Sequence, residues 1–277
     1  MDRAPAPLRP LLSLDIAKIR REEEECWKQS TSLVAVSEED RKVMEAAGFD
    51  AKIVANGVDV EKFSLKSGIR NQESGIRKIL FIGDFKWIQN QDSVKFIIQD
   101  IFPKIKEQLD RHSGLSRISY RSNESDSGRG QNDGGVKLWI VAREIPSSIL
   151  SLTDDPEVLF DVESSSKETP EIFQEASVLL APIRVGGGTS YKILESMACG
   201  TPVVTMQMSA SAISAKDGEH LMVGNTAEEL AKKTLHVLQN EEVYEKIAVN
   251  GRKLIEEKYS WKEISRKLEE VYKSVAN

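Results

Sequence analysis

Short apolar runs alternate with longer segments of helical spacing along most of this chain. Runs of β-branched and aliphatic residues are typical of strands. They lie at 33–37, 52–59, 78–85, 136–142, 157–162 and 177–183. The run at 78–85 is apolar on both faces, as expected for a strand buried in a parallel sheet. The alternation of strands and helices therefore predicts a doubly wound α/β fold with right-handed crossovers.

Segments whose apolar residues recur at helical spacing separate these runs. They lie at about 91–111, 167–176, 226–240, 241–259 and 260–275. Pro103 predicts a kink within the first of them. Ser37 with Asp40, and Ser260 with Glu263, have the spacing of a helix cap. A helix is thus expected after Ser37 and another after Ser260.

One segment departs from this pattern. Residues 113–135 are rich in Ser, Gly, Asn and Asp and poor in large apolar side chains. Because such a composition buries little apolar surface, we interpret this segment as a disordered surface insertion. A binding role for its arginines is the alternative, and a solvated loop is the preferred interpretation.

Composition and charge narrow the class of protein. The chain has 277 residues, of which 40% are hydrophobic and 30% charged, which is typical of a globular protein with room for more than one domain. A net charge of −6 does not favour nucleic acid as a partner. No apolar run approaches the roughly 20 residues that span a bilayer, and the N-terminal residues lack the pattern of a signal peptide. We therefore expect a cytoplasmic protein.

The potential metal ligands are few and scattered. Cys26 and Cys199 lie far apart, and none of the three histidines has a partner at metal-ligand spacing. These residues predict neither a disulfide framework nor a metal site, so no metal is expected.

The segment 178–204 is the strongest candidate for chemistry. The predicted strand is followed by Gly186, Gly187 and Gly188, and a helix is expected from Thr189 onward. Glycine lets backbone amides approach a ligand closely, and the amides and dipole at a helix start bind anions such as phosphate. Thr189 and Ser190 would add hydroxyl donors at this helix start.

Two charged residues follow the glycines. Lys192 lies in the first turn of the expected helix, where its point charge can reach the anion. Glu195 lies three residues further on, so it shares one helix face with Lys192. A carboxylate in this position can accept hydrogen bonds from the vicinal hydroxyls of a ribose. A surface ion pair beside a flexible turn is the alternative, and the spacing supports the two interpretations about equally.

The glycine segment matches neither of two familiar nucleotide motifs. The Gly-Lys-Ser/Thr of a P-loop is absent from the sequence. The dinucleotide fingerprint is excluded because Tyr191 stands where its third glycine belongs. The spacing therefore predicts a phosphate site of another kind.

Five blocks of sequence in order give the chain a family resemblance. They are ANGVDVEKF at 55–63, FIGDFKWIQNQDSVKFIIQDIFPKI at 81–105, LWIVAREIP at 138–146, VLLAPIRVGGGTSYKILESMACGTPVV at 178–204 and GRKLIEEKYSWKEI at 251–264. Together they resemble the nucleotide-sugar-binding half of a GT-B glycosyltransferase, closest to retaining family 4, the glycosyl transferases group 1. The resemblance runs from about Thr31 onward, apart from the segment 113–135.

The resemblance implies a hexosyltransferase that uses a nucleoside-diphosphate sugar, needs no metal or other cofactor and retains the anomeric configuration. It implies that Glu195 binds the donor ribose. It implies that Lys192 and Arg184, the catalytic candidates, lie near the diphosphate. Gly186, Gly187, Gly188, Thr189 and Ser190 would lie beneath the phosphates and sugar.

Further donor contacts follow from the same resemblance. Gly83 would face the diphosphate across the cleft, and Arg143 with 159–162 would lie where the base is held. Two departures concern this donor site. Gly187 stands where many members have a first glutamate, and Gln89-Asn90 replaces a pair that begins with lysine. Lys86 is a candidate substitute for that lysine, and a solvated surface lysine is the alternative.

The resemblance also implies a division into domains. Residues 1–62 resemble the end of an N-terminal acceptor domain and the linker, and 63–277 resemble the Rossmann-like donor domain. On the order of 100 residues of an acceptor domain have no counterpart here. The expected partners are a nucleoside-diphosphate sugar and an unidentified acceptor, and an acceptor domain on a separate chain is a further alternative. The resemblance adds peripheral attachment at the inner face of the membrane as an alternative for a cytoplasmic protein.

Two other functions stay open. The chain could be a nucleotide-sugar-binding module without transferase activity of its own, which Gly187 and the missing acceptor domain favour. A nucleotide-sugar epimerase of the same fold needs acidic and histidine groups in the cleft. It is disfavoured because no histidine lies near the glycine segment.

Overall fold

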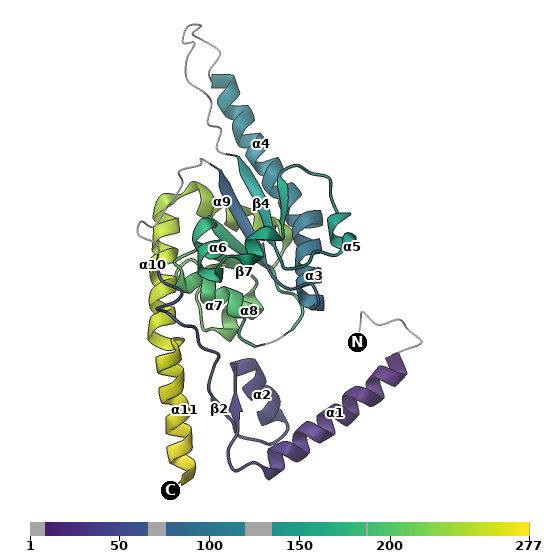
Figure 1. Ribbon diagram of the computed structural model, residues 1–277, viewed down its shortest axis with the longest axis vertical. Helices are drawn as coiled ribbons and strands as arrows, with labels where there is room; N and C mark the ends of the chain where they lie inside the picture. The colour runs from purple at the N-terminus through teal and green to yellow at the C-terminus, as the bar shows by residue number, and fades with distance from the viewer. Residues whose placement is uncertain (1–8, 66–75, 120–134, 187, 277) are drawn as a thin grey trace. The chain divides into compact units, whose positions relative to one another are not determined.

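The computed structural model describes residues 9–65, 76–119, 135–186 and 188–276. The chain divides into two compact units (Figure 1). The smaller unit comprises Met1–Ala55 with Ser265–Asn277, and the larger comprises Asn56–Ile264. The larger unit contains the sheet that positions the candidate site.

The sheet of the larger unit is parallel throughout and has six strands among the described residues. These strands are β3 (Arg77–Ile82), β4 (Val136–Val141), β5 (Val158–Asp161), β6 (Val178–Ala181), β7 (Val203–Thr205) and β8 (Met222–Val223). Their spatial order is β5-β4-β3-β6-β7-β8. The chain therefore builds outward from β3 to β5, returns to the other side of β3 and builds outward again, so the predicted doubly wound fold is confirmed.

Apolar side chains on both faces of the sheet explain why its central strands are buried. Ile79 and Phe81 of β3 point to one face, and Leu80 between them points to the other. All three side chains are fully buried. Strands covered on both faces read as continuous apolar runs, which is why 78–85 stood out in the sequence.

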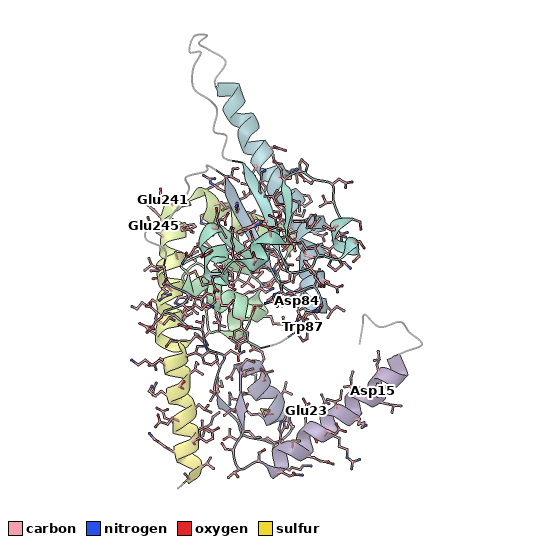
Figure 2. All side chains as sticks on the ribbon, in the orientation of Figure 1. Asp15, Glu23, Asp84, Trp87, Glu241 and Glu245 are labelled. Carbon is pink, nitrogen blue, oxygen red and sulfur yellow. The ribbon has the colours of Figure 1, made fainter. Side chains whose placement is uncertain are left out.

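Helices connect the strands of the larger unit. They are α3 (Ile88–Phe96), the π-helix η2 (Ile97–Ile101), α4 (Phe102–Ser119), α5 (Ser147–Leu150), the 3₁₀-helix η3 (Glu163–Ser166), α6 (Thr169–Glu175), α7 (Tyr191–Ala198), α8 (Gln207–Ala212), α9 (Ala227–Gln239) and α10 (Glu241–Lys258). η2, α4 and α9 pack together, and α7 packs against α6 and α10. Side chains of α10 such as Glu241 and Glu245 lie on the outside of this unit (Figure 2).

The long helix after β3 is irregular where Pro103 predicted a kink. The π-helical segment η2 stands immediately before Phe102 and Pro103. Proline cannot donate a backbone hydrogen bond, and a π-turn is one way in which a helix accommodates that loss.

The same helix corrects one prediction. α4 continues to Ser119, so the first residues of the segment 113–135 are helical rather than disordered. The remainder of that segment, 120–134, lies outside the described residues. The prediction was wrong at 113–119 because it relied on composition, and a helix that is already established can continue into polar residues.

The smaller unit contains α1 (Arg9–Gln29), β1 (Val34–Ala35), α2 (Glu38–Ala46), β2 (Lys52–Ile53) and most of α11 (Trp261–Ala276). β1 and β2 pair in parallel, and Ala35, Met44 and Ala51 form a small core. The predicted strands at 33–37 and 52–59 shrink to these two-residue pairs. The sequence pattern did not predict α1.

Both predicted helix caps are present. The Asp40 N–H donates to Ser37 Oγ over 3.1 Å at the start of α2. The Glu263 N–H donates to Ser260 Oγ over 3.4 Å at the start of α11. Along the described stretches, no helix has the length and apolar character that crossing a bilayer requires.

Candidate functional site

A pocket of about 470 Å³ lies where the loops after β3 and β6 meet. Such a volume is typical of small-molecule sites. β3 and β6 are neighbours in the sheet, yet the chain leaves them in opposite directions, to β4 and to β7. Doubly wound sheets bind their ligands at the carboxyl ends of the strands at this reversal of strand order. The sheet topology therefore marks this pocket independently of any motif.

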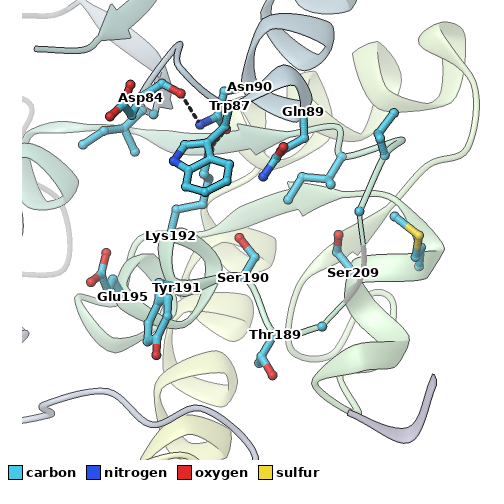
Figure 3. A pocket seen from close by; sticks show the side chains of 17 residues that line it. Asp84, Trp87, Gln89, Asn90, Thr189, Ser190, Tyr191, Lys192, Glu195 and Ser209 are labelled. Carbon is cyan, nitrogen blue, oxygen red and sulfur yellow. Dashed lines mark hydrogen bonds between the residues drawn. The ribbon is translucent and has the colours of Figure 1, made fainter. Parts of the chain in front are cut away.

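Three loops and helix starts supply the lining of the pocket (Figure 3). The end of β3 and the residues after it contribute Ile82, Gly83, Asp84, Trp87, Gln89 and Asn90; after β6 come Ile183, Val185, Gly186, Gly188, Thr189, Ser190, Tyr191, Lys192 and Glu195; and Met208 and Ser209 follow β7. Figure 2 shows Asp84 and Trp87 close together on the larger unit. The lining is mixed, because hydroxyl, amide and charged groups stand beside aromatic rings.

The glycine loop has the backbone conformation that requires glycine. Gly186 has φ +109° and Gly188 has φ +76°, in the region that side chains disfavour. A Cβ at Gly186 would meet no neighbouring atom, so the backbone angle rather than space demands glycine there. Gly187 lies outside the described residues. Gly186 and Gly188 both line the pocket.

The start of α7 faces the same pocket. Thr189 and Ser190 line it, and the Ser190 side chain makes no capping hydrogen bond to the helix. The first N–H groups of a helix have no partner within the helix, so together with the helix dipole they favour an anion. The carbonyl of Thr189 accepts a hydrogen bond from Asn56 Nδ2 over 3.4 Å, which helps to fix the loop.

Lys192 is the basic side chain that the fold brings to the pocket from α7. Its Nζ donates to Asn90 Oδ1 over 2.8 Å and lies 4.7 Å from the centroid of the Phe81 ring. Burial lowers the pKa of Lys192 to about 8, and the nearby Glu195 partly opposes this shift. At neutral pH Lys192 is therefore charged in most molecules of the protein. In the described chain no carboxylate is hydrogen bonded to this ammonium.

Glu195 lies one turn along α7 from Lys192 and also lines the pocket (Figure 3). Burial raises the pKa of its carboxyl to about 7, although Lys62 and Lys192 act in the opposite direction. The geometry thus brings Lys192 and Glu195 into the lining of one pocket, and their roles in binding a donor stay a prediction. A half-buried carboxyl group beside a lysine with a shifted pKa is typical of a functional site.

Three predicted site residues do not belong to the pocket lining in the described chain. Arg184 is exposed and makes a bidentate ion pair with Asp92 over 3.0 and 2.9 Å, while its guanidinium lies 4.1 Å from the Phe96 ring centroid. Arg143 and Lys86 are exposed on the loops after β4 and β3. Gly83, by contrast, lines the pocket.

The sequence did not identify several lining residues. Trp87 is 61% exposed and lines the pocket, whereas Trp139 is buried in the core. Met208 and Ser209 belong to α8, a short helix without a clear apolar period. Their one available signal was their position just after a strand of the sheet, where ligands bind.

The described residues contain no group of three or more His, Cys, Asp or Glu side chains that could hold a metal ion. Acidic residues in the pocket lining are Asp84 and Glu195. The Asp84 carboxylate accepts the backbone N–H of Lys86 over 2.8 Å, which fixes the turn after β3.

Comparison with known proteins agrees with the topology and the pocket. The chain belongs to the family of glycosyl transferases group 1, whose model matches residues 76–240. That range contains every residue that lines the pocket. The predicted family resemblance is thereby confirmed.

The chain is also similar to curated relatives. Phosphatidyl-myo-inositol mannosyltransferases from Mycobacterium leprae (strain TN) and Mycobacterium tuberculosis (strain ATCC 25618 / H37Rv) are each 26% identical to it over 250 residues. The match covers 88% of this chain and 59% of each of those proteins. The chain thus spans about three fifths of the length of these relatives.

Solved structures share the fold. A sucrose-phosphate synthase from Thermosynechococcus elongatus has a TM-score of 0.65 at 13% identity, covering 91% of this chain and 60% of that one. Anabaena Alr3699/HepE in complex with UDP and glucose has a TM-score of 0.63 at 15% identity, covering 93% and 67%. The predicted GT-B-type α/β fold is confirmed by these likenesses.

Proposed function

We propose that this chain is the donor-binding part of a retaining glycosyltransferase that uses a nucleoside-diphosphate sugar. One observation carries the proposal. Lys192 and Glu195 project from the first turns of α7 into a pocket at the reversal of strand order. A cation and a carboxylate on one helix face match the diphosphate and ribose of such a donor.

Different residues of the pocket would bind different parts of the donor. Lys192 and the backbone N–H groups at the start of α7 would hold the diphosphate, helped by the hydroxyls of Thr189 and Ser190. The glycines at 186–188 would let the phosphates and the sugar approach the backbone. Glu195 would accept hydrogen bonds from the ribose hydroxyls in its ionised form.

The reaction would need little covalent chemistry from the chain. The bond between the anomeric carbon and the diphosphate oxygen breaks, and the acceptor oxygen bonds to the same face of the sugar. The leaving phosphate takes the proton of the acceptor hydroxyl. The charge that develops on the diphosphate is stabilised by Lys192 and the helix amides, an electrostatic contribution that is often the largest in catalysis.

The proposal gives lesser roles to three other basic residues, which are Arg184, Lys86 and Arg143. Arg184 would reach the diphosphate only by giving up its ion pair with Asp92. Lys86 and Arg143 lie on loops after neighbouring strands, and the segment 159–162 with Arg143 is where we expect the base to bind. The proposal requires no metal or other cofactor.

The wider setting is proposed from the relatives. Curated relatives are named as mannosyltransferases of phosphatidyl-myo-inositol, and solved neighbours are described with UDP and with UDP-glucose. These names support a hexose donor and a nucleoside diphosphate, and they leave the base and acceptor of this chain open. We propose a cytoplasmic location, with peripheral attachment to the membrane if the acceptor is a lipid.

A nucleotide-sugar-binding module without transferase activity is the second candidate. Gly187 stands where many members have a glutamate toward the transferred sugar. Binding without transfer by the chain alone would favour this alternative.

Calorimetry with UDP, GDP and ADP and their sugar derivatives tests the proposal. We expect one nucleotide to bind clearly more tightly than the others and Glu195→Ala to weaken it about tenfold or more, because hydrogen bonds to a charged group are lost. Glu245→Ala, which changes an exposed carboxylate outside the pocket, should bind like the wild type. Equal loss in both variants, or no binding to any nucleotide, would contradict the proposal.

A further inference from the structure

We propose that Asn90 is a positioning residue that holds the Lys192 ammonium in the pocket and keeps its charge available to an anion. The inference deepens the proposed function and rests on it for the identity of that anion. Asn90 lies on α3 after β3, and Lys192 lies on α7 after β6, so the contact joins the two loops that form the site.

Two hydrogen bonds fix the amide of Asn90. Its Nδ2 donates to the backbone carbonyl of Asp84 over 2.8 Å (Figure 3). Its Oδ1 accepts from Lys192 Nζ over 2.8 Å. The amide has donors on one end and an acceptor on the other. Because its donor end is committed to a carbonyl, its oxygen must face the ammonium. Rotating the amide by half a turn would set its N–H groups against the Lys192 ammonium and its oxygen against the Asp84 carbonyl, so both hydrogen bonds would be lost.

Gly83 makes room for this arrangement. A Cβ at position 83 would lie 2.8 Å from both Cγ and Nδ2 of Asn90. Any larger residue would therefore displace the amide from its place between Asp84 and Lys192. On the other side of the lysine, the Phe81 ring lies 4.7 Å from Nζ and limits its movement. The glycine at the end of β3 is thus explained by Asn90 rather than by a backbone angle.

An amide suits this task better than a carboxylate. A neutral oxygen orients an ammonium and stabilises its charge, whereas a carboxylate would form an ion pair with it. The other charged groups around Lys192 are Glu195 on α7 and Asp84 on the loop after β3, both of which line the pocket. Neither is hydrogen bonded to Lys192 in the described chain. The positive charge is therefore held in place and left for a ligand.

The first experiment measures the pKa of Lys192 in the free protein by NMR of labelled lysine side chains. Asn90→Leu removes the accepting oxygen at similar size, so we expect the pKa of Lys192 to fall below its wild-type value. Asn90→Asp adds an opposite charge, so we expect the pKa to rise above it. Gln91→Leu, on the same helix but outside the pocket lining, removes a hydrogen bond to the Phe85 carbonyl and serves as the matched control.

The second experiment measures the affinity of the same variants for a nucleoside-diphosphate sugar across pH. Both Asn90 variants should bind about tenfold or more weakly at neutral pH, although their Lys192 pKa values shift in opposite directions. The alkaline loss of binding should move to lower pH in Asn90→Leu and to higher pH in Asn90→Asp. Gln91→Leu should keep the wild-type affinity and profile, even if it unfolds at a lower temperature.

The outcomes separate this inference from the proposed function. Equal Lys192 pKa values in wild type, Asn90→Leu and Asn90→Asp, in proteins with native spectra, would overturn the role of Asn90. Shifted pKa values without nucleotide-sugar binding by the wild type would keep that role and contradict the proposed function. Unchanged affinity in Lys192→Met would overturn the diphosphate as the anion that Asn90 serves.

Discussion

At the residue scale, the pocket couples two ionisable groups whose pKa values approach each other. Burial lowers the pKa of Lys192 to about 8 and raises that of Glu195 to about 7. Both shifts have the same main cause, the removal of a charged group from water. A ligand with a diphosphate and vicinal hydroxyls would favour the charged form of each group. In the free site, burial of the charged form of each group is therefore unfavourable, and such a ligand would offset that cost.

The raised pKa of Glu195 predicts a pH dependence of stability. The ordinary pKa of a glutamate is about 4.5, and the pKa of Glu195 in the folded state is about 7. Between these two pH values the folded state therefore binds more protons at this site than the unfolded state does. The contribution of Glu195 to the free energy of unfolding is therefore fully present below pH 4.5 and is lost as the pH rises through 7. Chemical denaturation across this range should show that the decline is smaller in Glu195→Gln, which cannot titrate. Parallel curves for the two proteins would contradict the raised pKa.

Trp87 offers a direct optical signal for ligand binding. Its indole is 61% exposed and lines the pocket, so a bound ligand would cover it and change its fluorescence. We expect a saturable change on titration with the nucleotide sugar, and we expect Trp87→Phe to lose most of it. Trp261→Phe removes another exposed indole outside the pocket lining and should keep the change. Loss of the signal in Trp261→Phe instead would place the ligand elsewhere.

Sequence reasoning identified some pocket residues and missed others for a physical reason. Lys192 and Glu195 could be predicted because helical spacing alone places them on one face. The role of Asn90 could not, because its contact with Lys192 depends on β3 and β6 being neighbours in the sheet. Arg184 was placed at the diphosphate from the family pattern, and the spacing carried no sign of its ion pair with Asp92.

At the element scale, α7 is the helix on which the site depends, and its C-terminus is closed by a glycine. Gly200 has φ +71°, its N–H donates to the Met197 carbonyl over 3.1 Å, and the Thr201 N–H donates to the Ser196 carbonyl over 2.9 Å. These two bonds form a Schellman motif, which needs a left-handed residue at this position. The motif ends the helix and turns the chain into β7.

Replacing this glycine should destabilise the larger unit. Gly200→Ala is expected to lower the free energy of unfolding by about 1–2 kcal/mol, because a side chain disfavours the left-handed conformation. Gly200→Asn should cost less, since asparagine tolerates that conformation better. Urea denaturation of the three proteins measures the difference. Equal stability of the alanine variant and the wild type would contradict the backbone argument.

Helices and strands with a clear apolar pattern could be predicted from the sequence, and those without one could not. The central strands are apolar on both faces and appeared clearly, whereas α8 is a six-residue helix whose sequence, QMSASA, has no period. α1 was missed because several of its apolar residues are exposed and its sequence is highly polar. α4 extended past the predicted boundary because composition alone does not show where a helix ends.

At the scale of the whole molecule, the pocket proposed as the donor site belongs to one compact unit. Every lining residue of the pocket falls within Asn56–Ile264. The predicted domain boundary at 62–63 stays a prediction, and the compact units divide at 55–56 and again at 264–265, because most of α11 joins the smaller unit. A sequence pattern could not anticipate the second division, since α11 is a continuous helix across it.

The completeness of the catalytic apparatus is a separate question from the donor site. The match spans 59% of the length of the curated relatives, so transfer to an acceptor by this chain stays a proposal. Donor binding by the larger unit is therefore the central claim, and transfer to an acceptor is its extension. The two are tested by different experiments.

The most direct test of the central claim is a crystal structure of the chain with the nucleoside diphosphate that binds most tightly in calorimetry. We expect the diphosphate within hydrogen-bonding distance of Lys192 Nζ and the first N–H groups of α7, and the ribose hydroxyls on Glu195. Asn90 should keep its contacts with Asp84 and Lys192. A nucleotide bound away from the loops after β3 and β6, or one that leaves Lys192 and Glu195 without contacts, would contradict the account.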